Sequence, residues 1–170
     1  MSDQESNIYF QLLHRYNLIF KENDDLYRRL ADQFGLPDSA FWILYCLRES
    51  RVPITQKQLC EWIYYSKQTV NSGLKSLERS GYITLEVGKD RRSKQILLTD
   101  SGKKLASKTV DQIIQKEQQA IASMGNDAME QFLLLFRIYT DALKQQFQTL
   151  NPVCRDENSI KENSDANSII

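Results

Sequence analysis

The chain has 170 residues, of which 41% are hydrophobic and 26% charged, and it carries 22 basic and 22 acidic residues. This composition is ordinary for a globular protein and suits one domain, or one core with appendages. No apolar run approaches the ~20 residues of a membrane-spanning helix, and the polar opening differs from a signal peptide. Cys46, Cys60 and Cys154 are odd in number and widely separated, which argues against disulfides or a cysteine zinc site and favours a cytoplasmic location.

The zero net charge hides an asymmetry. Residues 51–104 hold 11 basic and 5 acidic side chains, a net charge of +6, and the rest of the chain carries −6. A basic central region, flanked by acidic N- and C-terminal parts of the chain, indicates a surface that binds a polyanion.

The first predicted elements are helices. Apolar residues at helical spacing line one face of a helix that runs to about residue 33, and they are Ile8, Leu12, Tyr16, Ile19 and Phe20. Residues 38–50 predict a second helix, capped by Asp38 or Ser39.

Residues 54–65 predict a third helix, in which Thr55 and Gln58 have the spacing of a capping box. Residues 66–81 predict a fourth helix, with Ser66 as its N-cap, Gly81 as its stop and an apolar face of Val70, Leu74 and Leu77. Gly73, in the middle of this helix, costs ~1 kcal/mol relative to alanine. We explain it by close packing.

The hydrophobic period then changes from helical to two. Ile83, Leu85 and Val87 alternate with polar residues, and the alternation resumes at Ile96 and Leu98, which predicts a β-hairpin. The connecting stretch GKDRRSKQ, residues 88–95, holds four basic residues and one acid.

The C-terminal part is again predicted to be helical. Thr99 is the expected cap of a fifth helix over residues 100–124. A sixth helix follows Asn126 and carries an apolar stripe at spacings of three and four, formed by Phe132, Phe136, Tyr139, Leu143, Phe147 and Leu150. Residues 151–170 are polar and aperiodic, which predicts disorder.

This order of elements predicts a mainly α fold with a small β-hairpin wing, namely a winged helix-turn-helix. The fourth helix would enter the major groove, because its polar face offers amide, hydroxyl and basic groups to base edges, and its first backbone amides favour a phosphate. The hydroxyls of Tyr64 and Tyr65 would bond phosphate. The expected contacts of the turn and helix are Tyr65, Ser66, Lys67, Gln68, Thr69, Asn71, Ser72 and Lys75, with Arg79 on the same face. An amphipathic helix with a merely solvated polar face would show the same pattern.

The basic hairpin loop supports the DNA interpretation. Arg91 and Arg92 are expected to reach the minor groove, whose negative potential attracts arginine, and Lys89 and Lys94 to touch phosphate. Asp90 would pair with a neighbouring arginine and organise the tip of the wing.

Residues 36–104 resemble the winged-helix region of the MarR family of bacterial transcription regulators. The resemblance rests on SKQTVNSGLKSLERSGYI from Ser66, on DRR at residues 90–92, and on LTDSG at residues 98–102. In layout alone it extends over about residues 8–150. The segment before the wing lacks the additional proline-containing residues of many members, so the wing is expected to be short.

The resemblance implies a homodimeric regulator, expected to be a repressor, that binds a pseudo-palindromic operator in duplex DNA. It divides the chain into an N-terminal dimerisation helix (1–35), the DNA-binding region (36–104), C-terminal dimerisation helices (105–150) and a tail (151–170). The apolar stripes of the first and last helices agree with a dimer, although a monomeric helical core would also use them. A winged helix that binds an acidic protein partner is the alternative function.

The resemblance also implies a pocket for a small aromatic or lipophilic effector, typically an acid, which His14, Arg15, Trp42 and Tyr45 would border. His14 is the only histidine and no other ligand lies at helical spacing from it, so no metal site is expected. Cys46 and Cys60 lie among apolar residues and are expected to be buried packing residues, not sensors. No cofactor or enzyme motif is present, and a cysteine–histidine nucleophile pair could use only His14.

Overall fold

The structure is a computed structural model that describes residues 3–63, 65–87 and 94–150. The chain divides after Gln119 into two compact units. The predictions for the tip of the wing and for the tail fall outside the described residues. None of the described helices is long and apolar enough to cross a membrane.

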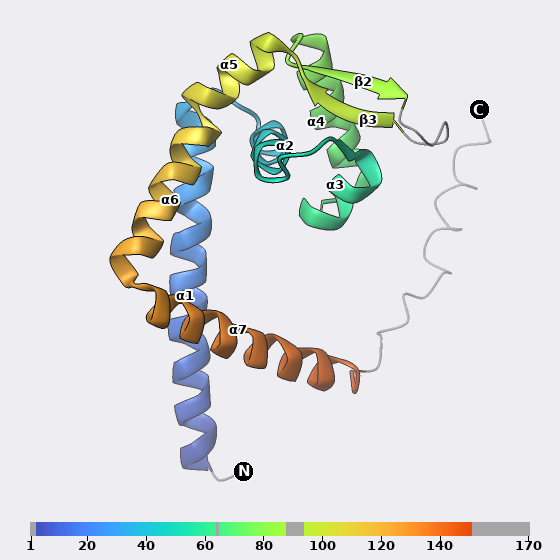
Figure 1. The fold of residues 1–170 in the computed structure, drawn as a ribbon. Helices are drawn as coiled ribbons and strands as arrows, with labels where there is room; N and C mark the ends of the chain where they lie inside the picture. The colour runs from blue at the N-terminus through green and yellow to red at the C-terminus, as the bar shows by residue number, and fades with distance from the viewer. Residues whose placement is uncertain (1–2, 64, 88–93, 151–170) are drawn as a thin grey trace, which may run out of the picture. The chain divides into compact units, whose positions relative to one another are not determined.

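The described elements confirm the expected fold class, a mainly α protein with a small hairpin (Figure 1). In chain order they are α1 (Asp3–Gln33), α2 (Asp38–Glu49), β1 (Ile54–Thr55), α3 (Gln56–Ile63), α4 (Lys67–Arg79), β2 (Ile83–Val87), β3 (Lys94–Leu98), α5 (Asp100–Lys108), α6 (Val110–Met124) and α7 (Asn126–Phe147).

Helix α2 is the centre of the first unit. It packs against α1, α3, α4, α5 and β3. Six of its twelve residues are buried, and they are Ala40, Phe41, Ile43, Leu44, Cys46 and Leu47. This burial on several sides explains why the α2 sequence is apolar around much of its circumference.

The sheet is antiparallel, with the strand order β1–β3–β2. Ile96 at its centre pairs with Ile54 on one side and with Leu85 on the other, and Ile54 and Ile96 are both buried. Strand β1 was missed in the sequence because two residues are too short to show a period of two. The prediction that the third helix begins at residue 54 was therefore wrong, because residues 54–55 form this strand.

The predicted N-terminal caps of α3 and α4 and the glycine after α4 are confirmed, although α3 is shorter than predicted and spans Gln56–Ile63. The backbone amide of Thr55 donates to Gln58 Oε1 at 2.9 Å, and the Gln58 amide donates to Thr55 Oγ1 at 3.3 Å, which completes the capping box. Ser66 Oγ accepts from the Thr69 amide at 3.1 Å and caps α4. Gly81 ends the turn after α4 with φ +73°, a conformation that favours glycine.

Close packing explains Gly73, as predicted. A Cβ atom at this position would lie 2.6 Å from Ile43 Cδ1 and 3.0 Å from Ser39 Oγ. The missing side chain therefore lets α4 approach α2.

Two predictions about helix ends were wrong. Helix α2 is capped by Pro37 without a side-chain hydrogen bond, because the Asp38 carboxylate instead accepts from the Tyr65 hydroxyl. The predicted fifth helix is two helices, interrupted at Thr109, which has φ −127° and ψ −94°. Thr109 is buried and its hydroxyl donates to the Leu105 carbonyl at 2.8 Å, a side-chain bond to the backbone that competes with regular helix.

Candidate nucleic-acid interface

The polar face of α4 is the centre of the candidate interface. Val70, Gly73, Leu74 and Leu77 are buried on its inner face. The outer face holds a shallow hollow lined by Lys67, Gln68, Asn71, Ser72 and Lys75, of which all but the half-buried Asn71 are exposed. The structure thus brings five of the predicted DNA contacts together on one surface.

Asn71 is oriented by a residue that the sequence analysis missed. Gln56 Nε2, at the start of α3, donates to Asn71 Oδ1, and both side chains are half-buried. This bond fixes the direction of the Asn71 amide, which retains its two N–H donors and one acceptor lone pair. No signal in the sequence pointed to Gln56, because the pairing joins two helices.

The start of α4 offers backbone donors. The first intrahelical bond runs from the Val70 amide to the Ser66 carbonyl at 3.0 Å, and the Thr69 amide is used by the Ser66 cap. The amides of Lys67 and Gln68 precede these bonds and lie at the positive end of the helix dipole, which suits a phosphate.

Tyr65 has a different partner from the one predicted. Its hydroxyl donates to the Asp38 carboxylate, and burial together with this hydrogen bond raises the pKa of Tyr65 above its usual value. The bond ties the turn before α4 to the start of α2. A contact from Tyr65 to phosphate would require this hydroxyl to exchange partners, and Tyr64 lies outside the described residues.

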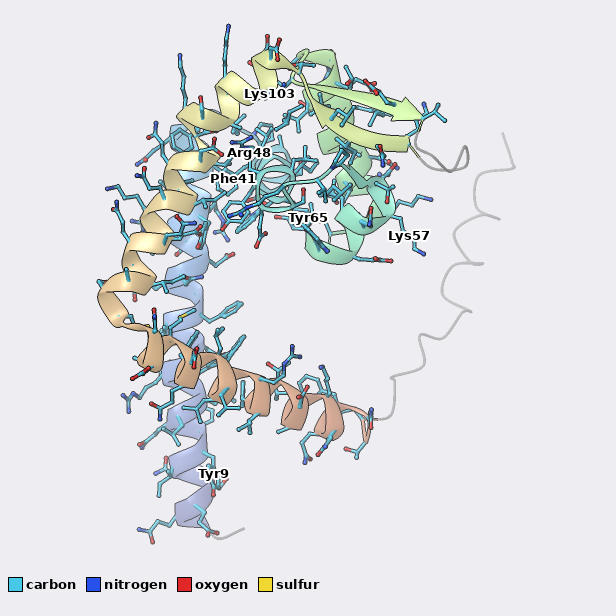
Figure 2. All side chains as sticks on the ribbon, in the orientation of Figure 1. Tyr9, Phe41, Arg48, Lys57, Tyr65 and Lys103 are labelled. Atoms are coloured by element: carbon cyan, nitrogen blue, oxygen red, sulfur yellow. The ribbon has the colours of Figure 1, made fainter. Side chains whose placement is uncertain are left out.

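Three lysines surround a second cavity, of about 630 Å³, beside α4. Lys57 of α3, Lys67 of α4 and Lys94 of β3 line it, together with Cys60. Lys57 was not among the predicted contacts, although it contributes to the basic surplus of residues 51–104. Its side chain is 87% exposed and extends from α3, and Glu61 lies 4.0 Å from its amine (Figure 2).

The wing-tip residues Lys89, Asp90, Arg91 and Arg92 lie outside the described residues, so their predicted roles stay predictions. The strands that lead to the tip are paired along their whole length, from Ile83 opposite Leu98 to Val87 opposite Lys94.

The LTDSG segment has a structural explanation. Thr99 Oγ1 donates to the Gly81 carbonyl at 2.6 Å and accepts from the Gly102 amide at 3.0 Å, so this side chain caps α5 and holds the turn before β2. A Cβ atom on Gly102 would lie 1.9 Å from the Tyr82 carbonyl oxygen. Only glycine therefore allows α5 to approach the hairpin this closely.

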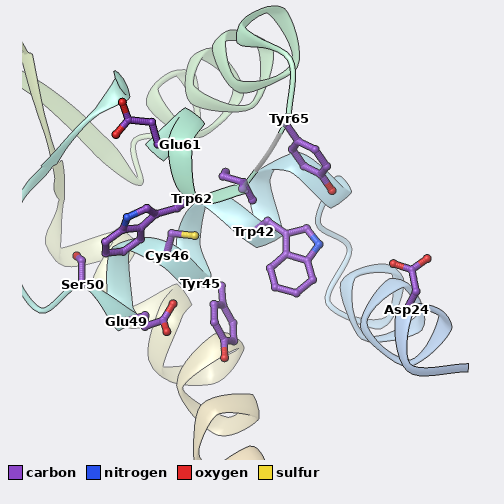
Figure 3. A pocket seen from close by; sticks show the side chains of 10 residues that line it. Asp24, Trp42, Tyr45, Cys46, Glu49, Ser50, Glu61, Trp62 and Tyr65 are labelled. Atoms are coloured by element: carbon purple, nitrogen blue, oxygen red, sulfur yellow. The ribbon is translucent and has the colours of Figure 1, made fainter. Parts of the chain in front are cut away.

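A third cavity, of about 860 Å³, contains half of the predicted effector pocket. Trp42 and Tyr45 line it, whereas His14 and Arg15 are exposed on α1 and are not among its lining residues (Figure 3). Cys46 also lines this cavity and is otherwise buried, as predicted, and burial followed by the charge of Glu49 raises its pKa to about 11. Cys60 is only half-buried, so its predicted burial is incomplete.

One carboxylate joins three helices close to this cavity. Tyr27 of α1 donates to Glu117 Oε1, and Tyr45 of α2 donates to Glu117 Oε2 at 2.5 Å. Burial and then the hydrogen bond to Glu117 raise the pKa of both tyrosines. Arg48 also reaches α6 and donates to both carboxylate oxygens of Asp111, at 2.6 and 2.7 Å. Within the described part of the chain, no three acidic, histidine or cysteine side chains gather as a metal site would require.

Known proteins share both sequence and fold with this chain. The family model described as MarR family matches residues 34–93. The HTH-type transcriptional regulator YwoH of Bacillus subtilis is 29% identical over 133 residues, which cover 75% of this chain and 93% of YwoH. NMB1585, a MarR family regulator from Neisseria meningitidis, is 26% identical with a TM-score of 0.65, over 81% of this chain and 94% of that one.

The MepR–DNA complex of S. aureus has the same fold, with a TM-score of 0.59 and 24% identity over 76% of this chain and 96% of MepR. The fold, the α4 surface and these similarities agree with the resemblance seen in the sequence. Over residues 34–93 the chain matches the model of the MarR family, and over most of its length it is similar in sequence and fold to winged helix-turn-helix transcription regulators of that family.

Proposed function

We propose that this regulator is a cytoplasmic homodimeric repressor that binds a pseudo-palindromic operator in double-stranded DNA and is released by a small-molecule effector. The exposed polar face of α4 is the observation that carries the proposal. It combines amide and hydroxyl groups that suit base edges with lysines that suit phosphates, on a helix whose opposite face is buried.

Each element has a role in this proposal. Gln68 and Asn71 contact base edges, with Asn71 held by Gln56. Lys57, Lys67 and Lys94 contact phosphates on both sides of α4, and Arg91 and Arg92 enter the minor groove. MepR of S. aureus supports this arrangement, because its structure with the same fold is a DNA complex.

Exposed apolar residues support the dimer. Helix α1 exposes Ile8, Tyr9, Phe10, Leu12, Leu13, Leu18, Ile19, Phe20 and Leu26. In the second unit, none of the 22 residues of α7 is buried, although it carries Phe132, Leu133, Leu134, Leu135, Phe136 and Ile138. Apolar surface of this extent marks an interface, and two copies of the chain supply it symmetrically. The two α4 helices would then read half-sites about 10 base pairs apart, or a multiple of that.

DNA binding is tested with genomic fragments selected by the purified protein and measured by fluorescence anisotropy. We expect Gln68→Ala to reduce the preference for the selected fragment over random DNA. We expect Lys67→Ala to lower the affinity for the selected fragment and for random DNA alike, and to reduce the slope of log affinity against log salt concentration by about one. Lys108→Ala, an exposed lysine of α5, is the matched control. Wild-type binding by both α4 variants would refute the proposed interface.

The wing is tested by replacing both Arg91 and Arg92 with alanine. Operator affinity should fall sharply, while the dimer mass from light scattering and the helix content from circular dichroism stay unchanged. Affinity for DNA should also fall linearly with the logarithm of salt concentration, because bound phosphates release counterions. Binding that does not depend on salt would favour the protein-partner alternative.

A further inference from the structure

The side chains of Gln56 and Asn71 form a pair where α3 meets α4. The two helices are in contact (Figure 1). Gln56 is the first residue of α3, and its Nε2 donates to Oδ1 of Asn71, which lies about one turn into α4. Both side chains are half-buried, and Asn71 also lines the outer hollow of α4. The pair therefore connects the interior of the helix-turn-helix with the surface proposed to meet DNA.

Both partners of this pair are held by contacts that do not involve each other. Helix α3 begins at its capping box, directly after β1, which is paired with β3 in the sheet. Helix α4 is capped by Ser66 and packs closely on α2 at Gly73. The fold therefore sets the separation of Gln56 and Asn71. Their hydrogen bond exists before DNA is bound, so neither side chain has to be ordered on binding.

The hydrogen bond decides which end of the Asn71 amide is left for another partner. Oδ1 is held toward α3 by the Gln56 amide nitrogen, whereas Nδ2 keeps both of its N–H donors. Lys67 and Lys75 line the same hollow, and their ammonium groups can only donate. The surface around Asn71 is therefore rich in donors, and it suits a base edge that consists of acceptors.

The bases differ in the groups that they present in the major groove. Guanine presents two acceptors, O6 and N7, whereas adenine presents one acceptor and an amino donor, and cytosine presents an amino donor. The usual contact of asparagine with adenine needs the amide oxygen as the acceptor for the adenine amino group. In Asn71 this oxygen is held toward α3, so the contact with adenine is disfavoured.

We propose that Gln56 is a positioning residue for base recognition, and that it makes Asn71 a hydrogen-bond donor that selects guanine over adenine and cytosine. Gln56 acts through Asn71, by holding its Oδ1 atom away from the bases. The base preference rests on the proposed function, since it requires α4 to enter the major groove. The orientation of Asn71 does not, because the hydrogen bond is present in the free protein.

The base pair that faces Asn71 is located first. Selection from a randomised duplex library with the wild type gives the half-site, and Asn71→Ala should lose the preference at one base pair of it. Duplexes that differ only at this pair then give the preference as a ratio of dissociation constants, measured by fluorescence anisotropy. For the wild type, we expect guanine to bind about tenfold more tightly than adenine. A wild-type preference for adenine, or an Asn71→Ala variant with every preference intact, would overturn the proposal.

Gln56→Glu tests the role of Gln56, because it reverses the direction of the hydrogen bond. A carboxylate can only accept, so Asn71 has to turn its NH₂ group toward α3 and its oxygen away from α3. The preference should then change from guanine to adenine or cytosine, whose edges carry an amino donor, and again by about tenfold.

Gln58→Glu is the matched control. It places the same charge on the exposed side of α3, two residues along the chain, and glutamate serves the capping box as well as glutamine does. It should weaken the binding of all the duplexes but keep the preference for guanine. If Gln56→Glu keeps this preference as Gln58→Glu does, Gln56 does not position Asn71 and the proposal is wrong.

NMR of the side-chain NH₂ groups tests the orientation of Asn71 without DNA. Exchange of the Asn71 NH₂ protons with water should be slower in Gln56→Glu than in the wild type, because only the variant engages them in the bond to residue 56. Equal exchange in both proteins would refute the orientation.

The two measurements separate the inference from the proposed function. Slower exchange in Gln56→Glu, in a protein that binds no duplex DNA, would refute the proposed function and leave the orientation of Asn71 standing. Sequence-selective DNA binding whose preference does not respond to Gln56→Glu would refute the role of Gln56 and leave the proposed function standing.

Discussion

Glu117→Gln is expected to loosen the attachment of α6 to α1 and α2. In the wild type, the two carboxylate oxygens accept from two hydroxyls, those of Tyr27 and Tyr45. A glutamine offers one oxygen and one NH₂ group, so only one tyrosine can keep its role as donor. A hydrogen bond to a charged group contributes about 1.5–3 kcal/mol, and because Glu117 is only half-buried we take the lower part of this range, about 2 kcal/mol.

This loss corresponds to a fall in Tm of about 5 °C for a chain of this size. Thermal unfolding followed by circular dichroism measures it, with Glu78→Gln as a control of equal charge change. In a double-mutant cycle with Tyr45→Phe, the combined loss should be smaller than the sum of the single losses, because both changes disrupt the same bond. A Tm for Glu117→Gln equal to that of the control would refute the proposed attachment.

Three further outcomes are expected. Gly102→Ala should lower the free energy of unfolding by about 3 kcal/mol, because the added Cβ would collide with the Tyr82 carbonyl oxygen. This loss outweighs the gain in helix propensity, and chemical denaturation measures it. The free energy of unfolding should fall above about pH 10, because the Tyr45 hydroxyl loses its proton in the unfolded chain but keeps it in the folded chain, where its pKa is raised. This fall with pH should be shallower in Tyr45→Phe. Iodoacetamide at pH 8 should modify half-buried Cys60 faster than Cys46, whose pKa is raised to about 11, as peptide mass spectrometry will show.

The local elements were largely readable from the sequence, because their signals are short-range. The capping pairs Thr55–Gln58 and Ser66–Thr69, the glycine stop at residue 81 and the apolar face of α4 depend on residues within a few positions of each other. The period change at Ile83 likewise predicted the hairpin. From these elements the exposed face of α4, and hence its candidate DNA contacts, followed without tertiary information.

The helix break at Thr109 and the real cap of α2 were not predictable in this way. The Thr109 side chain is buried by packing, and Asp38 is used by Tyr65, 27 residues away. Propensity alone favours a continuous helix and an aspartate cap at these positions, and tertiary contacts override both.

The sequence by itself determined the order of helices and strands, the buried face of α4 and the basic surplus of the middle region, because periodicity and charge are properties of neighbouring residues. Only the tertiary structure decided which distant side chains meet. It joined Gln56 to Asn71 and gathered Lys57, Lys67 and Lys94 around one cavity. It also showed that the cavity lined by Trp42 and Tyr45 does not include His14 and Arg15 in its lining. Contacts between helices and strands depend on packing and not on spacing along the chain, so the sequence could not predict them.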